Sequence, residues 1–107
     1  VVKNVYILTT NIAGLVAGGT VSELWQQHEA LARAVANDVI DIQEHLTGNH
    51  FDREALIQGM LKAFDGDPNH GCMGRSAPAR LQRALGIADE AGLEVPRLRQ
   101  IVAEQPG

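Results

Sequence analysis

Apolar side chains recur every three or four positions along most of this chain, which is the spacing of one face of an α-helix. In the opening segment the recurring positions are Val5, Leu8, Ile12, Leu15 and Val16. The same segment is rich in valine, isoleucine and threonine, which favour β-strands by propensity. We favour a buried helix over residues 3–17, ended by the pair Gly18-Gly19.

A second and longest helix is predicted from residue 20 to residue 47. It begins at Thr20-Val21-Ser22-Glu23, which has the form of a capping box, because the threonine hydroxyl and Glu23 can each bond a backbone amide of the other. Gly48 suits the position after the last turn, since glycine adopts positive φ without penalty. The expected buried positions are Leu24, Leu31, Val35, Val39, Ile42 and Leu46.

Three shorter helices complete the predicted fold. Asp52 is the expected N-cap of a third helix, and residues 65–75, rich in turn formers, are expected to be a loop. Ser76 is expected to cap a fourth helix with Pro78 in its first turn, where a missing N–H costs little. Gly92 would end that helix and Pro96 would open a short last one. The pattern therefore predicts an all-α bundle of about five helices.

Composition places the chain among single helical domains of modest size. It has 107 residues and no initiator methionine, so we expect a fragment lacking an N-terminal portion. No signal peptide or membrane-length apolar run is visible. The single Cys72 cannot form an intrachain disulfide, which favours a reducing, cytoplasmic setting.

Charge is uneven along the chain, whose net value is −4. Residues 1–70 carry nine acidic and four basic side chains, whereas residues 71–107 carry four acidic and five basic ones. An acidic chain with few aromatic residues does not favour nucleic acid as the main partner. The basic side chains of the second part remain a minor alternative for nucleic-acid binding, or for one phosphate or carboxylate: Arg75, Arg80, Arg83, Arg97 and Arg99.

Metal and cysteine chemistry find little support in the residue spacing. The segment Asp65–Asn69 resembles the start of a calcium loop, but His70 stands where such loops need glycine, and Ser76 where they need glutamate. The histidines and Cys72 lack zinc-ligand spacing. Cys72 has His70 nearby as a base but no third group to orient it. We expect no metal site.

One polar pair in the opening helix suggests a binding role. Positions 3, 7, 11 and 14 would form one ridge, so the amine of Lys3 and the carboxamide of Asn11 would face the same space about two turns apart. That arrangement suits a small polar substrate. The alternative is that Lys3 is solvated and Asn11 only bonds a neighbouring turn, with Ile7 interrupting the ridge.

These residues also carry a resemblance to a known family. The segment Lys3–Asn11, the restart Gly19–Leu24 and the ending Ala88–Pro96 are together similar to the C-terminal helical domain of ketopantoate reductases, within the wider 6-phosphogluconate-dehydrogenase-like group. In that family a lysine is followed four and eight residues later by asparagines. The resemblance spans about residues 3–102.

The resemblance implies a two-domain oxidoreductase that reduces a 2-oxo acid with NADPH, the cofactor being held mainly by an N-terminal Rossmann domain outside this chain. Lys3 matches the family's general acid, which protonates the carbonyl oxygen during hydride transfer. Asn11 matches a substrate-binding asparagine, and Ser76 falls near a family glutamate. The departures are Ile7 in place of the first asparagine, and arginines, Arg75 and Arg80, where a carboxylate is expected.

Our leading hypothesis is therefore the substrate-binding domain of such a reductase, with Lys3 catalytic and Asn11, Ser76 and Arg75 binding substrate. The arginines make a more anionic substrate than ketopantoate conceivable. A non-catalytic helical dimerisation domain is the alternative, because apolar stripes on several helices suit association equally well. The two are compatible, since a reductase of this group can also be a homodimer.

Overall fold

The computed structural model describes residues 2–67, 69–71 and 77–104, with side chains from Asn4 onward. Within these residues the fold consists of six α-helices and no β-strand, which confirms the all-α prediction. None of these helices is long and apolar enough to cross a membrane. The helices are α1 (Val2–Ala17), α2 (Val21–Gln27), α3 (Glu29–Thr47), α4 (Arg53–Gly66), α5 (Ala77–Ala91) and α6 (Pro96–Glu104).

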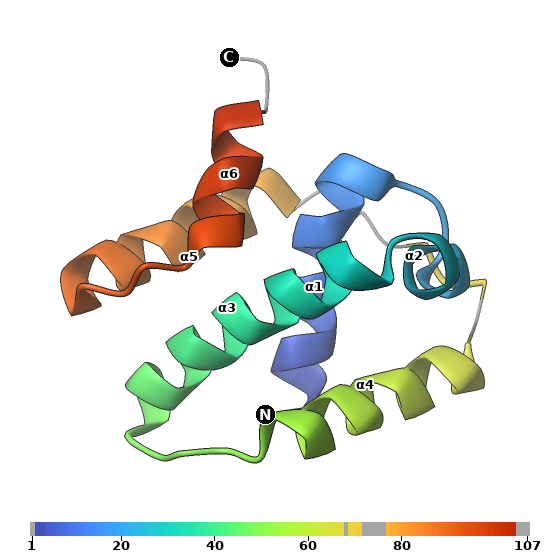
Figure 1. The fold of residues 1–107 in the computed structure, drawn as a ribbon, viewed down its shortest axis with the longest axis horizontal. Helices are drawn as coiled ribbons and strands as arrows, with labels where there is room; N and C mark the ends of the chain where they lie inside the picture. The colour runs from blue at the N-terminus through green and yellow to red at the C-terminus, as the bar shows by residue number, and fades with distance from the viewer. Residues whose placement is uncertain (1, 68, 72–76, 105–107) are drawn as a thin grey trace.

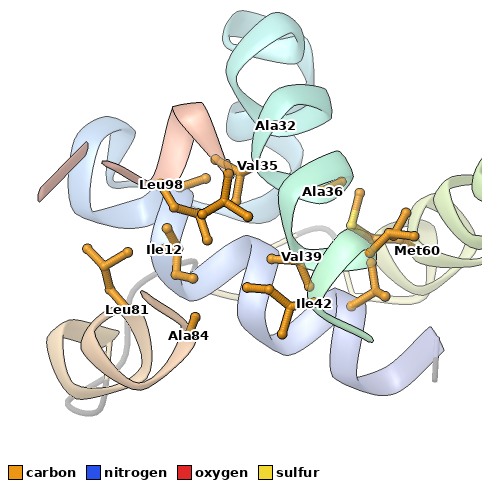
Figure 2. Close-up of a cluster of buried hydrophobic side chains, with 14 of the residues drawn as sticks. Ile12, Ala32, Val35, Ala36, Val39, Ile42, Met60, Leu81, Ala84 and Leu98 are labelled. Atoms are coloured by element: carbon orange, nitrogen blue, oxygen red, sulfur yellow. The ribbon is translucent and has the colours of Figure 1, made fainter. Parts of the chain in front are cut away.

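Helix α1 runs through the middle of the molecule and contacts each of the other five helices (Figure 1). Val5 and Ile12 are fully buried, as the three-and-four spacing predicted, whereas Val16, expected on the same face, is 45% exposed. Figure 2 shows Ile12 facing Leu98 of α6 and Leu81 of α5 across the core. Burial on several sides explains why α1 combines strand-favouring residues with a helical conformation, because packing overrides propensity.

The predicted second helix is two helices, which raises the count from five to six. The capping box is present, since Thr20 Oγ1 accepts a hydrogen bond from the Glu23 amide at 3.2 Å. The break falls at His28, whose φ of −134° and ψ of 38° are not helical. His28 is exposed between α2 and α3, so the prediction of one continuous helix over residues 20–47, which included His28, was wrong.

Helix α3 supplies much of the core, and Figure 2 shows Val35, Val39 and Ile42 projecting from it toward α1. It ends at Gly48, whose φ is +71°, as predicted. Leu46, expected to be buried, is 56% exposed.

Helix α4 packs against α1 and α3 and begins as expected, with Asp52 Oδ1 accepting from the Ala55 amide at 3.1 Å. It extends to Gly66, two residues into the predicted loop. The described part of that loop is tied to α2, because the Val21 amide donates to the His70 carbonyl at 2.9 Å.

Helices α5 and α6 form the opposite side of α1 (Figure 1). Pro78 lies in the first turn of α5, and Gly92, with φ of +70°, follows its last residue, as predicted. Pro96 opens α6, whose first amides donate to the buried Asp38 carboxylate of α3. The capping role expected for Ser76 falls outside the described residues.

Candidate functional site

The predicted polar ridge lies on a genuine helix, since Lys3, Ile7 and Asn11 all belong to α1. The Asn11 side chain is partly buried, and its Nδ2 donates to the Ile7 carbonyl at 2.8 Å. One amide donor of Asn11 is therefore used one turn earlier in its own helix. The side chain of Lys3 lies outside the described groups, so its convergence with Asn11 remains a prediction.

A pocket of about 290 Å³ opens between α1, α3 and α5, beside the first two turns of α1. Its position follows from the packing of these helices, with Ile42 and Ala84 projecting from α3 and α5 toward α1 (Figure 2). Apolar and polar side chains line it together. They are Asn4, Ile7 and Leu8 of α1, Ile42, Gln43 and Leu46 of α3, and Arg80, Arg83, Ala84 and Ile87 of α5.

Two of the polar side chains in this pocket lack protein partners. Nε of Arg80 is buried without a hydrogen bond. Gln43 is only 7% exposed, and its side-chain amide bonds no described residue. Buried polar groups in native proteins are nearly always paired, because an unpaired group loses its hydration without compensation. Of these two side chains, only Arg80 has such a buried unpaired donor, and it lies in a residue that lines the pocket.

The electrostatics of the pocket are positive. Arg80 and Arg83 both line it, and no acidic residue does. Elsewhere in the described chain the arginines have partners: Arg33, Arg53 and Arg99 pair with carboxylates, and Arg97 donates to Gln100. Because two positive side chains line the pocket and no carboxylate does, the pocket favours an anion.

The site residues named from sequence are only partly brought together. Ile7 lines the pocket, and Asn11 lies one turn further along the same side of α1 without lining it. Arg75 and Ser76 fall outside the described residues, just ahead of α5. Arg80, named above for its charge at this point in the chain, does lie in the pocket.

Three further residues line the pocket. Arg83 was named above only as one of the basic side chains of the second part of the chain, and Asn4 looks like an ordinary surface residue of a helix. Gln43 is the informative one, because it falls on the buried side of α3 beside Ile42, where an amide is unexpected. Burial of a glutamine next to an apolar stripe becomes evident only when α1 and α5 cover it.

Metal chemistry has no visible site in the described part of the chain, where no group of three or more histidine, cysteine, aspartate or glutamate side chains is arranged to hold an ion. Cys72 lies outside that part.

Comparison with known proteins leaves the family open. No family model matches the chain, and no solved structure matches it. The chain is similar to an enolase of Helicobacter acinonychis (strain Sheeba), with 32% identity over 73 residues. That alignment takes in 68% of this chain but 17% of the enolase, so the chain spans about a sixth of the length of this curated relative.

Proposed function

We propose that this chain is the substrate-binding helical domain of an NAD(P)-dependent oxidoreductase that reduces a 2-oxo acid, of the ketopantoate-reductase type and with a 6-phosphogluconate-dehydrogenase-like helical fold. The observation that carries the proposal is the position of the pocket, which opens beside the first two turns of the helix that bears Lys3. The cofactor, NADPH, is held mainly by a Rossmann domain in another part of the protein.

The roles follow from the chemistry of the reduction. Hydride addition to a 2-oxo acid places negative charge on the carbonyl oxygen, and an ammonium group such as that of Lys3 neutralises it and donates a proton. The substrate's carboxylate would meet Arg80, with Arg75 and Ser76 ahead of the same helix as further binding groups. Asn11 lies one turn beyond the pocket on the same side of α1, and its carbonyl oxygen is left for a part of the substrate that extends out of the pocket, since only Nδ2 is bonded within the helix.

The test uses the full protein that contains this chain. NADPH oxidation is measured across a panel of 2-oxo acids for the parent protein, Lys3→Ala and Lys62→Ala. Lys62 is the only other lysine in the sequence and is exposed on α4, so it is a matched control. Loss of Lys3 should lower kcat by roughly 10²-fold or more, as expected for a positioned acid, and loss of Lys62 should have no effect.

Two outcomes contradict the proposal. The first is a parent protein that oxidises NADPH with none of the 2-oxo acids. The second is a turnover that Lys3→Ala and Lys62→Ala leave equally unchanged.

The alternative, a non-catalytic dimerisation domain, has one observation in its favour. Leu46 and Val16 are 56% and 45% exposed, at the C-terminal ends of α3 and α1. They stand on separate helices, whereas a stable dimer buries roughly 1,200–2,000 Å² of surface. Sedimentation of the chain decides the matter: a dimer that Leu46→Glu dissociates would favour association as the main role.

A further inference from the structure

We infer that a second pocket, between α2 and α4, binds a small organic cation and prefers a planar guanidinium group to an ammonium group. This second pocket has a volume of about 270 Å³ and lies beside the C-terminal half of α4 (Figure 1). It shares no lining residue with the pocket between α1, α3 and α5. The inference goes beyond the proposed function and does not depend on it, because no residue assigned to the 2-oxo acid lines the second pocket.

The wall of the second pocket is aromatic and aliphatic. Trp25 of α2 and Leu61 of α4 are half-buried, and Phe64 of α4 is buried. The indole of tryptophan is the side-chain ring that attracts cations most strongly, because its face carries negative electrostatic potential. A wall of this kind suits a cation with a flat, weakly hydrated face.

The ring of Trp25 already contacts one guanidinium. Cζ of Arg33 lies 5.1 Å from the ring centroid, and Arg33 does not line the second pocket. Two carboxylates balance the charge of Arg33, because its Nε lies 2.9 Å from Glu29 and its Nη1 lies 3.6 Å from Glu54. Arg33 therefore shows that this indole accepts a guanidinium, and it adds little positive potential to the second pocket.

The charge of the second pocket comes from Asp65. It is the only charged residue among those described as lining this pocket, and its exposed carboxylate forms no ion pair in the described structure. Asp65 lies in the last turn of α4, where no basic side chain lies. A carboxylate there meets the negative end of the helix dipole, which is unfavourable. A cation bound beside Asp65 would neutralise both the carboxylate and the end of the helix.

The polar rim of the second pocket offers acceptors from both helices. Nε2 of Gln26 donates to Ser22 Oγ at 3.2 Å, and Nε2 of Gln58 donates to Glu54 Oε1 at 3.2 Å. Each amide thus donates to a residue one turn earlier, and its carbonyl oxygen is left to accept. A guanidinium carries N–H donors around the edge of its plane, so it can reach these oxygens and Asp65 while its face covers the ring. An ammonium group is a point charge and cannot do both.

The experiment is a titration of the 107-residue chain, whose helices enclose a core of their own, with butylguanidinium. Trp25 is the only tryptophan in the sequence, so its fluorescence and its indole N–H signal in NMR spectra report on this pocket alone. We expect saturable changes with a Kd on the order of 1 mM. Butylurea, which lacks the charge, and butylammonium, which lacks the plane, should each bind at least about fivefold more weakly.

A further probe distinguishes two sources of the guanidinium. N-acetylarginine N-methylamide presents the same group as an arginine side chain within a polypeptide. Binding as tight as that of butylguanidinium, or tighter, would support the site and identify an arginine of a polypeptide as its ligand. Weaker but saturable binding would support the site and identify a free small compound.

Two matched variants test the carboxylate. Asp65→Asn should weaken butylguanidinium at least about fivefold and raise the urea unfolding midpoint of the free chain, because it removes a negative charge from the end of α4. Asp67→Asn, which changes an exposed carboxylate two residues further on and outside the second pocket, should leave binding unchanged. An Asp65 that served only to stabilise the fold would lower the midpoint on substitution and leave binding unchanged.

Three results would overturn the inference. They are the absence of a saturable change with butylguanidinium, equal binding of butylurea or butylammonium, and equal effects of Asp65→Asn and Asp67→Asn on binding. None of these results bears on the reductase test, which measures turnover that depends on Lys3.

Discussion

Thr9 places a hydroxyl in the centre of the core, where it is fully buried and its Oγ1 has no hydrogen-bond partner. Its neighbour Thr10 is equally buried, but Thr10 Oγ1 donates to the Tyr6 carbonyl at 2.8 Å. The two threonines therefore differ in whether the hydroxyl has a hydrogen-bond partner, and not in burial. An unpaired buried hydroxyl lowers the free energy of unfolding by about 1–3 kcal/mol, whereas a hydrogen-bonded one raises it by a net value of about 0.5–1.5 kcal/mol.

We predict that Thr9→Val raises the free energy of unfolding by about 1 kcal/mol, because valine has nearly the same shape and no polar atom to strand. Thr10→Val is the control and should leave the value unchanged or lower it. Urea unfolding followed by circular dichroism measures both. Destabilisation by both substitutions would show that Thr9 has a partner after all.

Asp38 is a second residue whose effect depends on burial. Its Oδ2 accepts from the Arg97 and Leu98 amides at 2.8 and 3.1 Å, so it caps α6 from another helix. Burial raises the pKa of the Asp38 carboxyl, and the two backbone hydrogen bonds oppose the shift without cancelling it. A raised pKa means that the folded chain holds this proton more tightly than the unfolded chain, so this contribution to stability falls as pH rises above the ordinary aspartate range.

We predict that Asp38→Asn keeps an acceptor for α6, removes the buried charge and is at least as stable as the parent at pH 7. Asp38→Ala should lose about 1–2 kcal/mol, because both α6 amides lose their acceptor. Urea unfolding midpoints between pH 4 and pH 7 measure these effects. The Asp38→Asn variant should lack the part of the decline in stability with rising pH that the Asp38 carboxyl causes. Equal losses for the two variants would mean that the charge itself is required.

At the scale of the elements, one glycine inside α5 and one just after it illustrate how backbone conformation decides the effect of a glycine. Gly86 lies exposed inside α5, and a Cβ there would meet nothing within 4 Å. Gly92 follows α5 with φ of +70°, a conformation that side chains with a Cβ disfavour.

We predict opposite effects for the same substitution at these two positions. Gly86→Ala should raise the free energy of unfolding by about 0.5–1 kcal/mol, because alanine loses less backbone entropy in a helix. Gly92→Ala should lower it by about 1 kcal/mol, the cost of a left-handed residue with a Cβ. Thermal unfolding of the Gly86→Ala and Gly92→Ala variants measures both effects. Shifts of the unfolding temperature in the same direction would mean that α5 ends at another residue in solution.

At the scale of the whole molecule, Arg53 joins the start of α4 to the end of α3. It donates to Asp41, to Glu44 at 2.9 Å and to the Asn37 carbonyl at 2.9 Å. The amide of Phe51, in the connection between the helices, also donates to Glu44 at 2.9 Å. That backbone hydrogen bond, and the nearby charge of Arg53, hold the pKa of the Glu44 carboxyl below its usual range despite partial burial.

A lowered carboxyl pKa adds stability above the unfolded-state pKa, and that stability is lost as pH falls through the folded-state value. We therefore predict that Glu44→Gln is less stable than the parent at pH 7 and that the difference shrinks toward zero in acid. Urea midpoints from pH 7 to pH 3 measure this. Glu90→Gln, which removes an exposed carboxylate of α5 without an ion pair in the described structure, is the control. A difference that stays constant with pH would contradict the assignment.

The sequence by itself determined the helices and most of their ends. The capping box at Thr20, the Asp52 cap, Gly92 and Pro96 were all identified correctly, because a cap and a three-and-four repeat depend on residues within one turn of each other. The roles assigned to Lys3, Arg75 and Ser76 stay predictions. Local patterns did not reveal the break at His28. The apolar spacing continues across this residue, but the chain changes direction there between α2 and α3.

Only the tertiary structure determined which side chains come together in the pocket. The pocket joins residues as distant in the sequence as Asn4, Gln43 and Ile87, and the sequence does not reveal that Nε of Arg80 is buried without a hydrogen bond. Whether an arginine or a glutamine has a partner depends on which helices cover it, and that is set by long-range packing rather than by spacing along the chain. The same reason explains Asp38, which caps a helix about sixty residues away.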